Sequence, residues 1–182
     1  MPEPLFPPML LRAYIASDQA AVIRLWEECG LLRSWNDPVK DIARKLLVQR
    51  ELFLVGVLGE EVVATAMGGY DGHRGWVNYL AVSPQHQRKG LGRALMRRLE
   101  ELLQASGCPK LNLQVRAGNA AVLEFYRRLG YAEDPVVSLG KRLIHDHTPG
   151  TSIPGLEPSH GSTHEVVLSC KVAGYSPVSG SP

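Results

Sequence analysis

The sequence of 182 residues predicts a mixed α/β fold, in which helices cover the faces of a sheet. Segments whose residue pattern predicts a strand and segments with helical spacing follow one another along the chain. Their order, β-α-α-β-β-β-α-β-α-β, is typical of such a fold. Two apolar runs meet at Gly59 and Glu60, where we expect a hairpin. The composition, with 45% apolar and 21% charged residues, is that of a globular chain that can bury a sizeable core.

The first half of the chain predicts one strand, two helices and three more strands. Ser17 or Asp18 can cap the first helix, and Pro38 suits the first turn of the second. The expected elements, in chain order, are a strand at 9–15, helices at 18–31 and 38–49, and strands at 51–58, 61–70 and 76–82.

The second half continues the alternation of helices and strands. Its first helix has a core-facing stripe of leucines at positions 91, 95, 99 and 102. The expected elements are a helix at 90–106, a strand at 110–115, a helix at 119–129 and a last strand pair that ends at 138–144.

The composition changes near His145, and we expect a folded domain over residues 9–144 followed by a flexible tail over 145–182. Twenty of the 38 tail residues are Gly, Pro, Ser or Thr. Such a segment buries too little apolar surface to offset the entropy of ordering it. The run 164–172 (HEVVLSCKV) offers one short strand at most.

Cysteine usage and the lack of long apolar runs predict a cytoplasmic protein. Cys29, Cys108 and Cys170 are widely spaced and odd in number, which fits neither a disulfide framework nor a zinc site. No apolar run approaches the ~18–20 residues that span a bilayer. The N-terminus lacks the basic and then apolar pattern of a secretory signal.

The segment 80–95 (LAVSPQHQRKGLGRAL) carries the most informative chemistry. A strand ends there, and a loop containing glycine opens a helix, whose N-terminus offers unpaired N–H groups and the positive end of the helix dipole. Gly90 and Gly92 let a ligand approach the backbone, because no Cβ stands in the way. These features predict a phosphate or pyrophosphate site, with a tight turn before a surface helix as the structural alternative. Positive charge at the same place comes from Arg88, Lys89 and Arg93.

Two segments resemble the signature of the GNAT acetyltransferase superfamily. QRKGLG (87–92) matches the pattern Q/R-x-x-G-x-G/A, and GNAAVLEFYRRLGY (118–131) is similar to the second conserved segment of that family. One helix and one strand separate the two segments, as the family requires, and the resemblance covers about residues 9–144. The segments LLRSWNDP, MGGYDGHRGW, SGCPK and SLGKRLI are similar to the bacterial YpeA-type subgroup.

The resemblance implies a GNAT fold with a mixed sheet of six to seven strands and about four helices. It implies that the strands at 76–82 and 110–115 splay apart and admit the pantetheine arm of acetyl-CoA, the expected cosubstrate. Asn119 would face this cosubstrate from the second helix. The implied backbone contacts to pantetheine are Leu80, Ala81 and Val82, and those to the pyrophosphate are Arg88, Lys89, Gly90, Leu91, Gly92 and Arg93.

The family's activity is acetyl transfer from acetyl-CoA to an amine, and the resemblance assigns the acid role to Tyr126. This tyrosine would point at the sulfur and protonate the departing thiolate, while the N–H of Leu80 would stabilise the thioester oxygen. The structural alternative for Tyr126 is a packed helix aromatic beside Phe125.

The general base stays open. Some relatives that acetylate protein N-termini place a glutamate where Gln114 stands, and glutamine accepts no proton at neutral pH. Asp71, His73 and a chain of waters are the alternatives.

For the amine acceptor, we expect a wall formed by the connection between the first two helices. The candidates there are Trp35, Asn36 and Asp37, with Tyr70 and Asp71 completing the site. Asn36 or Asp37 as the cap of the second helix is the structural alternative, and both roles are compatible.

Other ligands are less well supported by the sequence. A Walker loop is missing, and Leu95 stands where a dinucleotide fingerprint needs a small residue. Arg97 is followed by Glu100 and Glu101 at i+3 and i+4, as on a solvated helix face, and no aromatic residues interleave the basic ones, so we expect no nucleic-acid partner. The histidines of the tail lack the partners of a metal site, and we expect no metal.

Two function classes remain: an acetyl-CoA-dependent N-acetyltransferase, and a GNAT module that binds acyl-CoA to sense it without turnover. The intact loop and Tyr126 favour the enzyme, and Gln114 keeps the alternative open. We expect acetyl-CoA and an amine acceptor as partners and no membrane, and a homodimer stays open.

Overall fold

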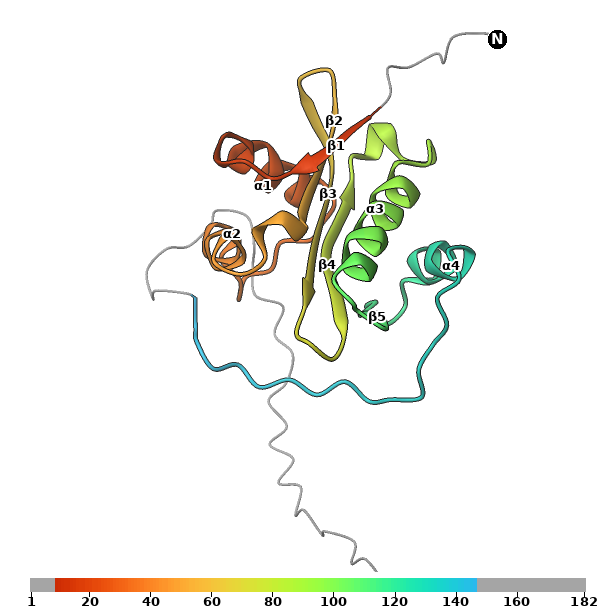
Figure 1. Ribbon diagram of the computed structural model, residues 1–182. Helices are drawn as coiled ribbons and strands as arrows, with labels where there is room; N and C mark the ends of the chain where they lie inside the picture. Colours follow the sequence, from red (N-terminus) through yellow and green to blue (C-terminus); the bar gives the residue numbers. More distant parts are fainter. Residues whose placement is uncertain (1–8, 147–182) are drawn as a thin grey trace, which may run out of the picture. The chain divides into compact units, whose positions relative to one another are not determined.

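The computed structural model describes residues 9–146, in which helices cover both faces of a sheet (Figure 1). The sheet has five strands in the spatial order β1-β2-β3-β4-β5. The first four pair antiparallel with their neighbours, and β5 runs parallel to β4. Their bounds are Leu10–Ala13 (β1), Phe53–Leu58 (β2), Glu61–Tyr70 (β3), Gly75–Val82 (β4) and Leu111–Leu113 (β5).

Four α-helices lie on the sheet, two on each face. α1 and α2 cover one face, and α3 and α4 the other (Figure 1). The expected mixed α/β architecture with about four helices is confirmed. The helix bounds are Gln19–Glu28 (α1), Pro38–Leu46 (α2), Leu91–Ala105 (α3) and Ala120–Arg128 (α4).

The sheet separates two hydrophobic clusters, because successive side chains of a strand point to opposite faces. On β2, Phe53 and Val55 pack under α1 and α2, whereas Leu54 packs under α3. The leucine stripe expected on α3 is buried at Leu95 and Leu99. Each face of the sheet therefore holds its own pair of helices.

The helix ends follow from local chemistry. Asp37 caps α2 by accepting hydrogen bonds from the N–H groups of Val39 and Lys40 (2.9 and 3.2 Å). The helix ends at Leu46 rather than near Gln49, whose φ of 50° is left-handed and incompatible with a helix. Asp18 precedes α1, but its carboxylate pairs with Arg12 (2.7 Å) instead of capping the helix.

The sheet has five strands rather than six or seven, and the last strand pair expected before Ile144 is absent. No strand is formed by residues 132–146, because they make no backbone ladder with a neighbouring strand. Their apolar side chains, such as Val136 (77% exposed) and Leu139 (91%), face solvent. Side-chain hydrogen bonds attach this segment to other parts of the domain. Gln114 donates to the hydroxyl of Ser138, and Arg142 donates to the carbonyl of Trp35.

Several expectations concern residues outside the described range 9–146. These are the tail with its short strand at 164–172, Cys170, and the histidines at 147, 160 and 164. Within the described range, Cys29 and Cys108 are free thiols. None of the helices described there has the length and apolar character needed to cross a bilayer.

Gly68 on β3 allows α3 to pack closely against the sheet, so Gly68→Ala should destabilise the fold. A Cβ at this position would lie 2.4 Å from Cδ1 of Leu99, which is fully buried. Overpacking of this kind costs about 1–3 kcal/mol. At the neighbouring Gly69, a Cβ would meet only the Gln49 amide oxygen at 3.7 Å. Urea unfolding should show a clear loss for Gly68→Ala and little change for Gly69→Ala; equal losses would contradict the packing account.

Candidate functional site

β4 and β5 diverge after three residue pairs, which opens a gap in the sheet. Gly75, Trp76 and Val77 pair with β5, and the rest of β4 has no strand on that side. The splay expected between these strands is therefore confirmed. The gap lies between β4 and the short edge strand β5, on one side of the sheet (Figure 1).

The exposed edge of β4 can be assigned from its hydrogen bonds. The N–H of Gly75 donates to Lys110 on the β5 side, and the N–H of Ser83 donates to Val63 of β3. Since N–H groups alternate in direction along a strand, those of Leu80 and Val82 point away from β3 and toward the gap, and that of Ala81 points toward β3.

A bulge at Tyr79 accompanies the divergence. Thr65 pairs with Ala81 and Met67 with Asn78, so Tyr79 and Leu80 together face one residue of β3. Tyr79 has a φ of 50°, a left-handed conformation that is unfavourable for a bulky side chain.

Three contacts hold Tyr79 in this conformation. Its ring stacks on Trp26 of α1 with centroids 4.0 Å apart, and its carbonyl accepts a hydrogen bond from Oγ1 of the buried Thr65 (3.0 Å). Its hydroxyl donates to Oδ2 of Asp41 (2.6 Å). Burial and the Asp41 carboxylate raise the pKa of Tyr79 to about 12, so the phenol stays protonated at neutral pH.

The N-terminus of α3 forms the expected anion-binding geometry. Gly90 precedes the helix with a φ of 82°, and its missing side chain leaves the helix uncapped. The N–H groups of Leu91, Gly92 and Arg93 donate to no acceptor within residues 9–146. Arg88, with a φ of 61°, and Arg93 are exposed beside them. Three backbone donors and the helix dipole suit a phosphate group.

α4 borders the same region. A Cβ on Gly92 would lie 3.3 Å from the ring of Phe125 and 3.5 Å from Val82, so the start of α3, the end of β4 and α4 come together. Asn119 caps α4 by accepting from the N–H of Val122 (3.2 Å). Because this cap occupies the side-chain oxygen of Asn119, only its side-chain amide nitrogen can take the expected role toward a cosubstrate.

Tyr126 is 8% exposed and packs edge-on against Phe125 and Tyr131. Its hydroxyl makes no hydrogen bond to any described residue, whereas the hydroxyl of Tyr131 donates to Glu100 (2.6 Å). Burial raises the pKa of Tyr126 to about 12, so this tyrosine holds its proton at neutral pH. Tyr126 is therefore a buried phenol whose O–H group can donate a hydrogen bond or a proton to a ligand.

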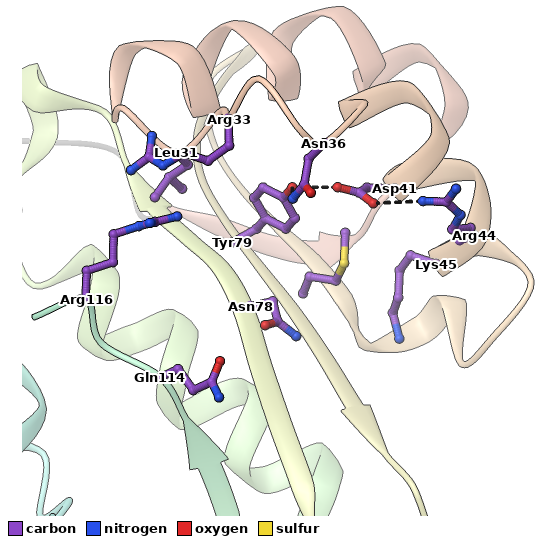
Figure 2. Close-up of a pocket in the computed structure, with 11 residues that line it drawn as sticks. Leu31, Arg33, Asn36, Asp41, Arg44, Lys45, Asn78, Tyr79, Gln114 and Arg116 are labelled. Atoms are coloured by element: carbon purple, nitrogen blue, oxygen red, sulfur yellow. Dashed lines mark hydrogen bonds and ion pairs between the residues drawn. The ribbon is translucent and has the colours of Figure 1, made fainter. Parts of the chain in front are cut away.

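A pocket of about 630 Å³ lies on the opposite side of the gap, between α2, the α1–α2 connection, the middle of β4 and the segment after β5 (Figure 2). The connection between α1 and α2 contributes Leu31, Arg33 and Asn36. The other residues that line it are Asp41, Arg44, Lys45, Met67, Asn78, Tyr79, Gln114 and Arg116.

Of the five residues expected at the acceptor site, Asn36 lines this pocket. Trp35 is exposed, and Asp37 is occupied as the cap of α2. Tyr70 and Asp71 lie at the far end of the β3–β4 hairpin, where Asp71 accepts from the N–H groups of His73 and Arg74 (both 2.7 Å). That turn is not part of the pocket lining.

Sequence reasoning missed Tyr79, Asp41 and the basic side chains of this pocket. Tyr79 stands within an apolar strand, where its left-handed backbone leaves no local signature. Gln114, by contrast, was singled out and does line the pocket.

A segment after α4 supports one wall of the pocket. The Asp146 carboxylate receives two hydrogen bonds from Arg44 of α2 (2.9 and 2.5 Å), and its carbonyl receives one from Lys40 (2.9 Å). The Arg44 guanidinium lowers the pKa of Asp146 to about 2. This pair therefore stabilises the docked segment above the ordinary pKa of 3.8, and the contribution is lost as the pH falls toward 2.

A carboxyl NMR titration of Asp146 should give an apparent pKa near 2, because Arg44 stabilises the charged form. Arg44→Ala should return the value toward 3.8. Arg128→Ala removes an arginine that pairs with Glu124 on α4, and it should leave Asp146 unchanged. An Asp146 pKa near 4 in the unmodified protein would show that the segment is not docked on α2.

Comparison with known proteins gives consistent similarities. Residues 20–131 match the acetyltransferase (GNAT) family. The chain is 52% identical over 139 residues to "Acetyltransferase SG1711" of Sodalis glossinidius (strain morsitans), an alignment that covers 76% of this chain and 98% of that relative.

Solved structures agree on the fold. The ribosomal-protein-S18-alanine N-acetyltransferase from Escherichia coli aligns with a TM-score of 0.59 and 26% identity, over 70% of this chain and 79% of that chain. AAC(6')-Iy in complex with a bisubstrate analogue, CoA-S-monomethyl-acetylneamine, aligns with a TM-score of 0.63 and 14% identity, over 75% and 99%. At that identity the second similarity concerns the fold alone.

Proposed function

The chain belongs to the acetyltransferase (GNAT) family, and we propose that it moves the acetyl group of acetyl-CoA to a primary amine, which attacks directly in a ternary complex. One observation carries the proposal: the gap between β4 and β5 lies between an uncapped helix N-terminus and a pocket open to an acceptor. The name of one structural neighbour, the ribosomal-protein-S18-alanine N-acetyltransferase, supports a protein amine as an acceptor in this fold.

The cosubstrate would bind on the α3 side of the gap. Its pyrophosphate would accept hydrogen bonds from the N–H groups of Leu91, Gly92 and Arg93, with added charge from Arg88 and Lys89. Its pantetheine amides would pair with the exposed edge of β4 at Leu80 and Val82, as a peptide adds to a sheet edge. Asn119 would contribute its amide nitrogen.

Tyr126 would act as the general acid. When the amine nitrogen bonds to the thioester carbon and the C–S bond breaks, the thiolate takes a proton from the phenol. The acetylated nitrogen then releases its extra proton to water, and the phenolate regains a proton from that water. A pKa of about 12 keeps that proton in place until the thiolate forms. The N–H of Leu80 would stabilise the negative charge on the carbonyl oxygen.

The acceptor has to lose a proton before it attacks, because an ammonium ion has no lone pair. Asp71 and His73 lie in the β3–β4 turn, outside the pocket. Among the described residues that line the pocket, Asp41 is the one carboxylate. We assign the ammonium proton to Asp41, directly or through a water molecule.

Steady-state release of free CoA thiol tests the proposal, together with mass spectrometry of the acetylated amine. Release that requires both acetyl-CoA and an amine is the expected result. A protein that acetyl-CoA stabilises thermally, but that releases no thiol with any amine, would be the sensing module instead.

Tyr126→Phe should lower turnover by about 10²–10³-fold, the effect of losing an acid catalyst. The KM for acetyl-CoA should change little, since the hydroxyl acts only as the thiolate forms. Stability should change by less than about 1 kcal/mol, because the hydroxyl has no described hydrogen-bond partner.

Tyr131→Phe is the matched control, since it removes a neighbouring hydroxyl that is bonded to Glu100. Its turnover should stay within about threefold of the unmodified enzyme, far above the loss for a missing acid. Unchanged turnover in Tyr126→Phe on a good acceptor would refute the acid role.

A further inference from the structure

The acceptor pocket is basic, although its proposed substrate is an amine. Four of the five charged side chains that line it are cationic, and Asp41 is the exception. A protonated amine without other charges would be repelled by this surface. The cationic side chains are Arg33, Arg44, Lys45 and Arg116.

These cations differ in how far they are already neutralised. Arg44 pairs with Asp146 at 2.5 Å and with Asp41 at 3.3 Å, so these two carboxylates largely neutralise its charge. The side chain of Arg116 makes no hydrogen bond or ion pair with any residue in the described part of the chain, and its carbonyl accepts from the N–H of Asn119 (3.1 Å). Lys45 is partly buried, and this burial lowers its pKa despite the nearby Glu51.

Arg33 is held in place without being neutralised. One guanidinium nitrogen donates to the carbonyls of Gly30 (2.7 Å) and Leu32 (2.6 Å), which fixes the side chain along its own loop. Neither acceptor carries a formal charge. The remaining donors of the guanidinium stay available to a ligand.

Figure 2 shows where these groups lie in the pocket. Arg33 comes from the α1–α2 connection and Arg116 from the segment after β5, and both guanidinium groups lie beside Leu31 at one end. Asp41 and Tyr79 lie farther along the pocket. The pocket therefore has a cationic end and a separate carboxylate.

We propose that the acceptor is a primary amine that also carries a carboxylate, which binds Arg33 and Arg116 while the amine lies toward Asp41. This inference rests on the proposed function and specifies its substrate class. Two guanidinium forks match the planar oxygens of a carboxylate, and an anion on the substrate removes the repulsion that a simple amine would meet. A free amino acid and an acidic peptide offer the same chemistry.

Matched acceptors that differ in one carboxylate test the proposal. The pairs are L-alanine with L-alaninamide for free amino acids, and Glu-Ala-Ala-amide with Gln-Ala-Ala-amide for peptides, so that the carboxamide member of each pair carries no carboxylate. Thiol release and mass spectrometry give kcat/KM for each member. We expect kcat/KM to be at least about tenfold higher for the member with the extra carboxylate, among either the free amino acids or the peptides. The group that shows this preference identifies which of the two is the acceptor.

Arg116→Ala should lower kcat/KM for the favoured acceptor about 10- to 100-fold and leave its carboxamide partner within about twofold. Arg116→Glu should reverse the preference. The KM for acetyl-CoA should stay unchanged in both, which excludes a role of Arg116 in cosubstrate binding. Arg97→Ala, on the exposed face of α3 where Arg97 pairs with Glu101, is the control and should match the unmodified enzyme.

Equal or better acetylation of the carboxamides would overturn the inference and leave the proposed acetyl transfer intact. A preference for the carboxylate that survives in Arg116→Glu would overturn the assigned site. Thermal stabilisation by acetyl-CoA without acetylation of any acceptor would overturn both the inference and the proposed function.

Discussion

The bulge at Tyr79 is the feature on which the rest of the site depends. A left-handed non-glycine residue costs about 1–3 kcal/mol and persists only where its surroundings enforce it. Trp26, Thr65 and Asp41 enforce it here, from a helix, a neighbouring strand and a second helix. The bulge follows directly after the point where β4 leaves β5, so one local distortion accompanies the opening between β4 and the edge strand.

The two faces of the sheet carry different chemical groups beside the gap. On the face of α3 and α4, uncapped N–H groups and a buried phenol are suited to an anionic thioester. On the face of α1 and α2, the pocket combines cationic side chains with a single carboxylate. In the proposed complex the cosubstrate and the acceptor would meet through the gap, where the thioester carbon would be accessible to an amine. In this arrangement the proposed acid Tyr126 and the proposed proton acceptor Asp41 come from opposite layers.

The sequence predicted those parts that local patterns determine. The strand at 61–70 and the start of α3 at Leu91 follow from alternation, a leucine stripe and glycine placement. The pocket is different, because Arg116 lies more than 70 residues along the chain from Arg33 and Asp41, and no spacing relates them. The last strand pair was wrong for another reason: residues 136–144 have strand-forming side chains, but a strand also needs a partner edge. Arg142 of this segment instead bonds to the α1–α2 connection, and Asp146 beyond it pairs with Arg44 of α2.

Whether acetyl-CoA enters the gap is tested most directly by residue-resolved amide hydrogen exchange with and without the cosubstrate. Bound acetyl-CoA should slow exchange at Leu80 and Val82, whose N–H groups face the gap, and at the start of α3. Ala81, which faces β3, should exchange at the same rate in both states and serves as the internal control. Protection of the α3 start alone, with Leu80 and Val82 unchanged at saturating acetyl-CoA, would contradict binding of the cosubstrate along the open edge of β4.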